Sequence, residues 1–166
     1  MSYHPQPHPY QRWIGAVVLP PRPPPAIIYY GLTPAGEAAV RYAISLLYNT
    51  LPDTYVHLFR EIRYITVSPI CGTGTLGCTN VRGAERTIFL SYVPEWMTPV
   101  NLAILIGHEG HHHFTINGQD YVQPHTCTDC SDPFQRATDW LYVWEDAVRP
   151  HLEETHRLVS YLDTVR

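Results

Sequence analysis

The chain has 166 residues and a formal charge of −4, with 45% apolar and 16% charged residues. These values are typical of a globular protein with enough chain for one hydrophobic core. All eleven basic residues are arginines and they form no basic block, which argues against a nucleic-acid-binding protein, because phosphate binding needs grouped cations. The N-terminus has no basic leader and only a short apolar run, so we expect no membrane association and a cytoplasmic location.

The first 26 residues differ from the rest in composition. They contain eight prolines, including PPRPPP at 20–25, which excludes a helix or a central strand. We therefore expect an extended arm, partly in the polyproline II conformation. It is either a disordered tail or an arm bound by its own domain or by a neighbouring subunit. Residues 27–166 are expected to form a single domain.

Three elements are predicted in the first half of this domain. Thr33 followed by proline is a helix start signal, and the apolar spacing after it predicts a helix over 34–50. The segments EIRYITVSP (61–69) and RTIFLSYVP (86–94) each predict a strand. A glycine-rich segment separates them, and the simplest arrangement is two strands joined by a long hairpin loop.

The second half is predicted to be mainly helical. The same start signal at 98–99 precedes a mostly apolar helix over 100–114, which should be buried. The loop that follows, 115–131, is longer than most connections and so is a candidate for function. A capping-box pattern at 132–135 begins a last helix, which Pro150 should kink or end before helical spacing resumes.

Four cysteines lie in two close pairs, Cys71 with Cys78 and Cys127 with Cys130. A disulfide within each pair, a cross-link between the two loops, and a structural zinc held by all four thiolates are all compatible with this spacing. We favour a stabilising role over a chemical one.

The helix over 100–114 ends in the pattern HExxH, formed by His108, Glu109 and His112. On a helix, residues i and i+4 share a face one turn apart, so the two imidazoles can bind one zinc ion. Glu109 then lies beside the open coordination position, where it can accept the proton of a zinc-activated water. The alternative is a polar helix end whose side chains pair with one another and with the last carbonyl groups.

In these three residues the chain resembles the zincin metallopeptidases, over about residues 86–148. The resemblance implies an α+β fold with a backing helix, a short mixed or antiparallel sheet, the HExxH helix and a C-terminal helix that supplies the third ligand. It also implies that the strand before the motif, near 87–93, is the sheet edge that pairs with an extended peptide. Such pairing aligns a peptide through main-chain hydrogen bonds, whatever its side chains.

The third ligand separates the zincin subgroups. The metzincin pattern HExxHxxGxxH requires glycine at position 115 and histidine at position 118. Thr115 and Gly118 occupy these positions, so that subgroup is excluded.

The remaining resemblance is gluzincin-like and implies a glutamate ligand from the next helix. Glu145, at the edge of the buried face of that helix, is the expected third ligand, with Asp139 and Asp146 as rivals. His125 in the preceding loop is a further alternative. The chain departs from the family pattern at Arg149, where an aspartate is expected four residues beyond the glutamate.

Four other residues near the motif are weaker candidates. His111 and His113 point away from the face of the two motif histidines and are expected outside the metal site. Tyr121 and Tyr142 could each donate a hydrogen bond to an oxyanion, and the alternative for each is a core tyrosine with a satisfied hydroxyl.

Together these residues predict a zinc-dependent peptidase that binds peptide or protein substrates. His108, His112 and Glu145 would hold the metal, and Glu109 would activate the water and then protonate the leaving amine. The alternative is a structural or assembly protein that keeps a zincin-like metal-binding fold, while its N-terminal arm contacts a protein partner or another copy of the chain.

Overall fold

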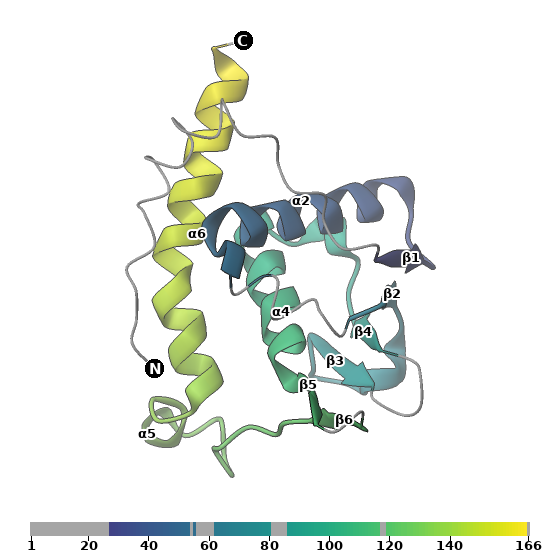
Figure 1. Ribbon diagram of the computed structural model, residues 1–166, viewed down its shortest axis with the longest axis vertical. Coiled ribbons are helices and arrows are strands. Elements are labelled where there is room, and N and C mark those ends of the chain that lie inside the picture. The colour runs from purple at the N-terminus through teal and green to yellow at the C-terminus, as the bar shows by residue number, and fades with distance from the viewer. Residues whose placement is uncertain (1–26, 54, 56–61, 81–85, 117–118, 166) are drawn as a thin grey trace.

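The computed structural model describes residues 27–53, 55, 62–80, 86–116 and 119–165 (Figure 1). Their fold is α+β, as predicted. The elements are β1 (Ile28–Tyr30), α2 (Pro34–Thr50), β2 (Tyr64–Val67), η1 (Pro69–Cys71), β3 (Gly77–Asn80), β4 (Thr87–Leu90), η2 (Pro94–Trp96), α4 (Pro99–His112), β5 (His113–Ile116), β6 (Gln119–Val122), α5 (Pro133–Arg136) and α6 (Trp140–Thr164). The predicted proline-rich arm, 1–26, lies outside the described residues.

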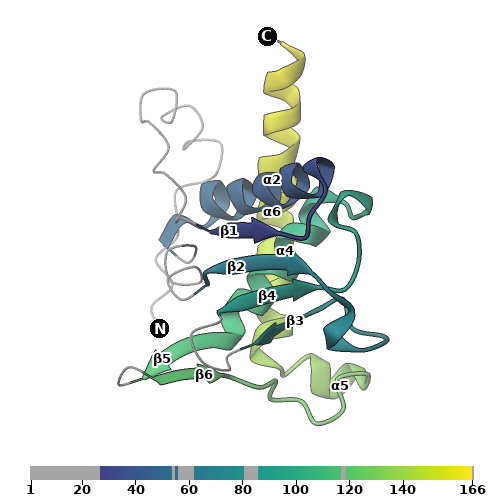
Figure 2. The same cartoon turned by 90° about the vertical axis from the view of Figure 1, so that its right-hand side faces the viewer.

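The larger sheet is mixed and has the strand order β1-β2-β4-β3 (Figure 2). Strands β1, β2 and β4 run parallel, and β3 is antiparallel to β4. The predicted hairpin between 61–69 and 86–94 is therefore wrong, although both strands exist as β2 and β4. They pair in parallel because the glycine-rich segment between them is not only a loop: it forms β3 on the far side of β4.

The predicted sheet edge is also wrong. β4 has a neighbour on both sides, and all four of its residues are buried. A strand that is buried on both faces has a continuous apolar run, and TIFL is such a run. Among the described strands, β3 forms the edge next to β4, with Cys78 opposite Phe89.

Helices α2 and α4 form the main core with the sheet. Val40, Ile44 and Leu47 of α2 and Leu102 and Ile106 of α4 are at most 2% exposed and belong to one buried cluster. Thr98 caps α4, because its hydroxyl accepts the backbone N–H of Asn101. The predicted helices over 34–50 and 100–114 are thus confirmed, the second with its end at His112.

α4 lies between the sheet and α6 (Figures 1 and 2). The two helices approach closely at Gly107, where a Cβ atom would lie 2.5 Å from Cη2 of Trp144. Only glycine permits this separation without moving a large aromatic ring. Because Gly107 immediately precedes the HExxH pattern, the same close approach brings α6 against the motif.

The chain after α4 differs from the prediction in three ways. The capping box at 132–135 begins only the short helix α5, and the last helix, α6, starts separately at Trp140. The predicted loop 115–131 begins with an antiparallel hairpin of β5 and β6. The last helix does not end at Pro150, which lies inside α6. Pro150 is exposed, so water can reach the carbonyl group that a proline leaves without a donor. Within the described ranges, no helix has the length and apolar character needed to cross a bilayer.

Candidate metal centre

The HExxH residues occupy the last two turns of α4. His108, Glu109 and His112 are 9%, 5% and 8% exposed, so all three are buried. The ring centroids of the two histidines are 5.0 Å apart, as expected for residues on one helix face. α4 ends directly after the motif, because His113 is its C-cap residue.

Both motif histidines donate a hydrogen bond from Nδ1. Nδ1 of His108 lies 2.7 Å from Oε1 of Glu145, and Nδ1 of His112 bonds to the backbone carbonyl of Gln123. Carbonyl and carboxylate oxygens only accept, so each Nδ1 carries the hydrogen and each neutral ring keeps its lone pair on Nε2. Burial lowers the pKa of His112 to about 4, so its ring is neutral near pH 7.

A third histidine reaches the same place from the loop after β6. Nδ1 of His125 lies 3.2 Å from Oδ1 of Asp139, so this ring also has its hydrogen on Nδ1. Its Nε2 lies 3.1 Å from Nε2 of His108. The ligand atoms of His108, His112 and His125 all lie within 4.8 Å of one another.

This arrangement suits a cation. With hydrogens on all three Nδ1 atoms, the Nε2 atoms of His108 and His125 point two lone pairs at each other, which is unfavourable unless a proton or a metal ion lies between them. Two nitrogens that share a tetrahedral zinc ion at 2.0–2.1 Å are about 3.3 Å apart. The separation of the His108 and His125 nitrogens is therefore close to that of two ligands on one metal ion, with the ligand atom of His112 within 4.8 Å of both.

Asp139 holds the loop histidine in position. This fully buried carboxylate accepts the backbone N–H groups of Thr126 and Cys127 at 2.8 and 3.1 Å, and it also caps the first turn of α6. Burial alone would raise the pKa of Asp139, but the backbone N–H of Cys127, the side chain of His125 and the backbone N–H groups of Tyr142 and Leu141 outweigh it and hold the pKa well below its usual range. One ionised side chain thus joins His125 to the start of α6.

The structure places the predicted third ligand differently. Glu145 lies on Nδ1 of His108, on the side of the ring opposite the converging nitrogens, and it is not part of the three-histidine group. Asp139 accepts from His125, and Asp146 is exposed. The residue that joins the two motif histidines is His125, which the sequence suggested only as an alternative.

Glu109 lies beside this group and contacts the edge strand. The Thr79 hydroxyl of β3 lies 2.8 Å from Oε2 of Glu109 and 3.0 Å from its backbone carbonyl. Burial raises the pKa of the Glu109 carboxyl above its usual value, while His108 and the Thr79 hydroxyl act in the opposite direction. A raised pKa brings a carboxylate closer to the range in which it works best as a general base near neutral pH.

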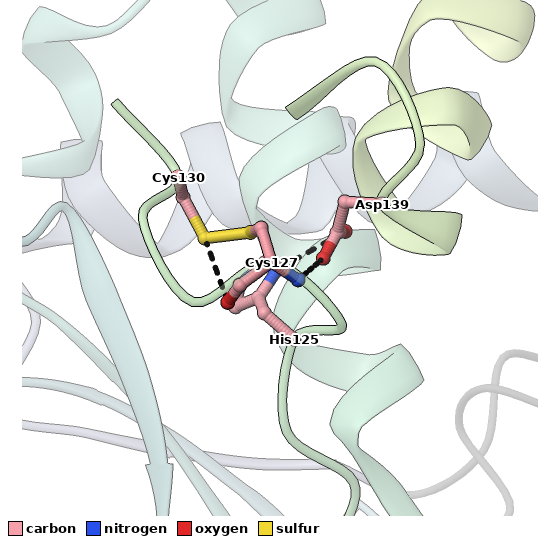
Figure 3. A group of neighbouring side chains, drawn as sticks. All are labelled: His125, Cys127, Cys130 and Asp139. Atoms are coloured by element: carbon pink, nitrogen blue, oxygen red, sulfur yellow. Dashed lines mark hydrogen bonds and ion pairs between the residues drawn. A yellow bond between two sulfur atoms is a disulfide. The ribbon is translucent and has the colours of Figure 1, made fainter. Parts of the chain in front are cut away.

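The cysteines form a disulfide within each pair, Cys71–Cys78 and Cys127–Cys130. The second disulfide lies beside His125 and Asp139, and these four residues form another group of potential ligands (Figure 3). Disulfide sulfurs are not thiolates, and the Asp139 oxygens already accept several hydrogen bonds. We therefore interpret these four residues as contacts that hold the loop carrying His125, and not as a second metal site.

A cavity of about 900 Å³ opens beside the three histidines. One wall is the strand β3 with the loop before it, and the other is formed by α4 and α6. Tyr142 lines the cavity, with its ring stacked on His125 at 4.9 Å between centroids. The guanidinium of Arg136 lies 3.7 Å from the centre of the Tyr142 ring and 3.8 Å from Oε2 of Glu145.

Two of the remaining candidates, His111 and His113, lie outside the three-histidine group. His111 packs against Trp144, with ring centroids 4.3 Å apart, and His113 is buried at the helix end. The side chain of Tyr121 is outside the described part of the structure. Comparisons with protein-family models, with curated proteins and with solved structures find no match to this chain.

Proposed function

We propose that the chain is a zinc-dependent peptidase of the zincin type, with His108, His112 and His125 as the metal ligands. One observation carries this proposal: three imidazoles with ligand atoms within 4.8 Å of one another lie beside a buried glutamate in a cavity. His125 takes the place that the sequence suggested for Glu145. Glu145 and Asp139 instead orient His108 and His125, as carboxylates commonly do for histidines that bind zinc.

Glu109 is the general base in this proposal. When bound, zinc polarises the substrate carbonyl and lowers the pKa of a water towards about 7. Glu109 accepts a proton from the attacking water and then gives it to the leaving amine. The hydroxyl of Thr79 keeps the carboxylate of Glu109 oriented, and the phenol of Tyr142 is available to donate a hydrogen bond to the developing oxyanion.

Strand β3 is the proposed site of peptide pairing. It lies at the edge of the sheet, and Gly77, Cys78 and Thr79 line the cavity. A Cβ atom at Gly77 would lie 2.9 Å from the Phe89 carbonyl, so glycine lets β3 lie close to β4, and it would be in ordinary contact with Cγ of Glu109 at 3.7 Å. An extended peptide that pairs with this edge would pass the three histidines.

The test compares the wild-type chain with Glu109→Gln, using zinc content and cleavage of an unstructured protein. We expect Glu109→Gln to keep its zinc and to lose about 100- to 10,000-fold in cleavage rate, the usual contribution of general acid–base catalysis. Glu153→Gln, an exposed position on α6, is the matched control and should leave the rate unchanged.

Two results would contradict the proposal. Full zinc occupancy without any Glu109-dependent cleavage would favour the assembly protein. A chain that binds no metal would exclude both the peptidase and the proposed ligand set.

A further inference from the structure

Besides Arg136, a second arginine lines the cavity. Arg149 lines the cavity and is half-buried, and its Nη1 atom donates to Oδ1 of Asn101 at 2.8 Å. This solvent-exposed bond joins α6 to α4 and places the guanidinium at the cavity wall. A guanidinium has five N–H donors, so most of its donors are not used by this bond.

The acidic side chain one turn before Arg149 on α6, Glu145, pairs with His108 and Arg136 and not with Arg149. In the part of the chain that the structure describes, no carboxylate forms an ion pair with Arg149, and its bonding partner is a neutral amide. Arg136, the other arginine of the cavity, differs: it lies 3.8 Å from Glu145 and is stacked on Tyr142. A guanidinium that is held in a cavity wall without a counter-charge favours an anionic ligand.

The bond to Asn101 gives the position of Arg149 relative to the three histidines. Asn101 precedes His108 by seven residues on α4, which corresponds to about 10 Å along the helix axis. An extended peptide covers this distance with about three residues. The apolar side chains of Met97, Ile104 and Leu105 line the same cavity.

β3 gives the direction of such a peptide. Gly77 lies near Leu105 and Glu109, and Thr79 two residues later bonds to Glu109, so β3 runs roughly in the same sense as α4. Antiparallel pairing is the slightly more stable arrangement of two strands. A peptide antiparallel to β3 directs its C-terminal half towards Arg149.

We propose that Arg149 binds a carboxylate of the substrate, about three residues from the bond that is cleaved. The inference rests on the proposed peptidase function and adds a substrate class to it. The carboxylate is either the C-terminus of a short peptide or an acidic side chain of a longer one, and both have the same chemistry at the guanidinium.

The experiment measures binding without cleavage, using the zinc-loaded Glu109→Gln chain and a fluorescent alanine-based hexapeptide in three forms. One form ends in a carboxylate, one in a neutral amide, and one in an amide with glutamate as the last residue. We expect at least one acidic form to bind about 10- to 100-fold more tightly than the neutral amide, as a charged hydrogen bond implies. The acidic form that binds identifies the source of the carboxylate.

Arg149→Gln is the decisive variant, because glutamine keeps a donor for Asn101 but removes the charge. It should abolish the preference for the acidic peptides, whereas Arg157→Gln, at an exposed position on the same helix, should preserve it. Equal binding of the three forms, binding of none of them, or a preference that survives Arg149→Gln would overturn the inference. An Arg149-dependent preference without any cleavage by the wild-type chain would refute only the peptidase function.

Discussion

The two sides of the three-histidine group, formed by His108, His112 and His125, are built in different ways. On one side, α4 presents His108 and His112 from consecutive turns of a single buried helix. On the other side, His125 comes from a loop, and Asp139 and the Cys127–Cys130 disulfide hold it there. The helix needs only local spacing to bring its ligands together, whereas the loop needs contacts with residues that follow it in the chain.

The same difference appears in the carboxylates that orient the histidines. Glu145 projects from inside α6 and reaches His108 because Gly107 lets the two helices approach. Asp139 stands at the N-cap of α6 and supports both the helix and the loop. The two sides therefore share α6, which provides one carboxylate to each.

The largest effect is expected from the loop ligand. His125→Ala should weaken zinc binding by more than about 100-fold, which exceeds the range for residues that only orient a ligand. A competition titration with a chelator measures the affinity, and His151→Ala, exposed on α6, is the control. Unchanged zinc affinity in His125→Ala would show that the helix side binds the metal with some other third residue.

A smaller effect is expected from Glu145→Gln. Glutamine can still accept from Nδ1 of His108, so the ring keeps its orientation and loses only a charged partner. We expect zinc affinity to fall by about 10- to 100-fold, less than in His125→Ala. The same chelator titration tests this prediction. If zinc affinity falls further in Glu145→Gln than in His125→Ala, Glu145 and not His125 is the third ligand.

The sequence brings the helix-side residues of the candidate site together and offers His125 of the loop only as an alternative to Glu145. HExxH is a local pattern, so His108, Glu109 and His112 could be recognised without knowing the fold. A helical wheel places Glu145 on a face, but it cannot decide between the metal and the far nitrogen of His108. The position of His125 depends on Asp139, fourteen residues later, through a side-chain contact that no spacing rule describes.

The sheet was predictable in part for a similar reason. Apolar runs identified β2 and β4, because each run is itself the signal for a strand. Their parallel pairing and the edge position of β3 depend on the path of the chain between them, where glycine and threonine gave only a loop signal. The edge position that the zincin resemblance implies for the strand near 87–93 belongs instead to β3 among the described strands.

The disulfides allow a third test of the two sides, with intermediate effects. Replacing Cys127 and Cys130 by serine opens a loop with a sequence separation of 3, and replacing Cys71 and Cys78 opens one with a separation of 7. Chain entropy predicts losses of about 2 and about 2.5 kcal/mol in the free energy of unfolding, measured by urea denaturation. Zinc affinity should fall only in the first variant, because that disulfide constrains the loop whose backbone N–H groups, at Thr126 and Cys127, bond to Asp139. Equal zinc affinities in the two variants would mean that the loop keeps its shape without its disulfide.

The smallest effect concerns the proposed general base, Glu109. It lies on α4, and a residue of strand β3 changes its pKa. The Thr79 hydroxyl donates to the Glu109 carboxylate and so lowers its pKa, against the larger effect of burial. A general base must be ionised, so cleavage should increase with pH through the pKa of Glu109. Thr79→Val removes the hydrogen bond, raises this pKa and should move the acidic limb of the pH–rate profile to higher pH. Thr75→Val is the matched control, because Thr75 lines the same cavity but donates to the Cys71 carbonyl. A limb that stays in place or moves to lower pH would show that helix α4 alone sets the basicity of Glu109.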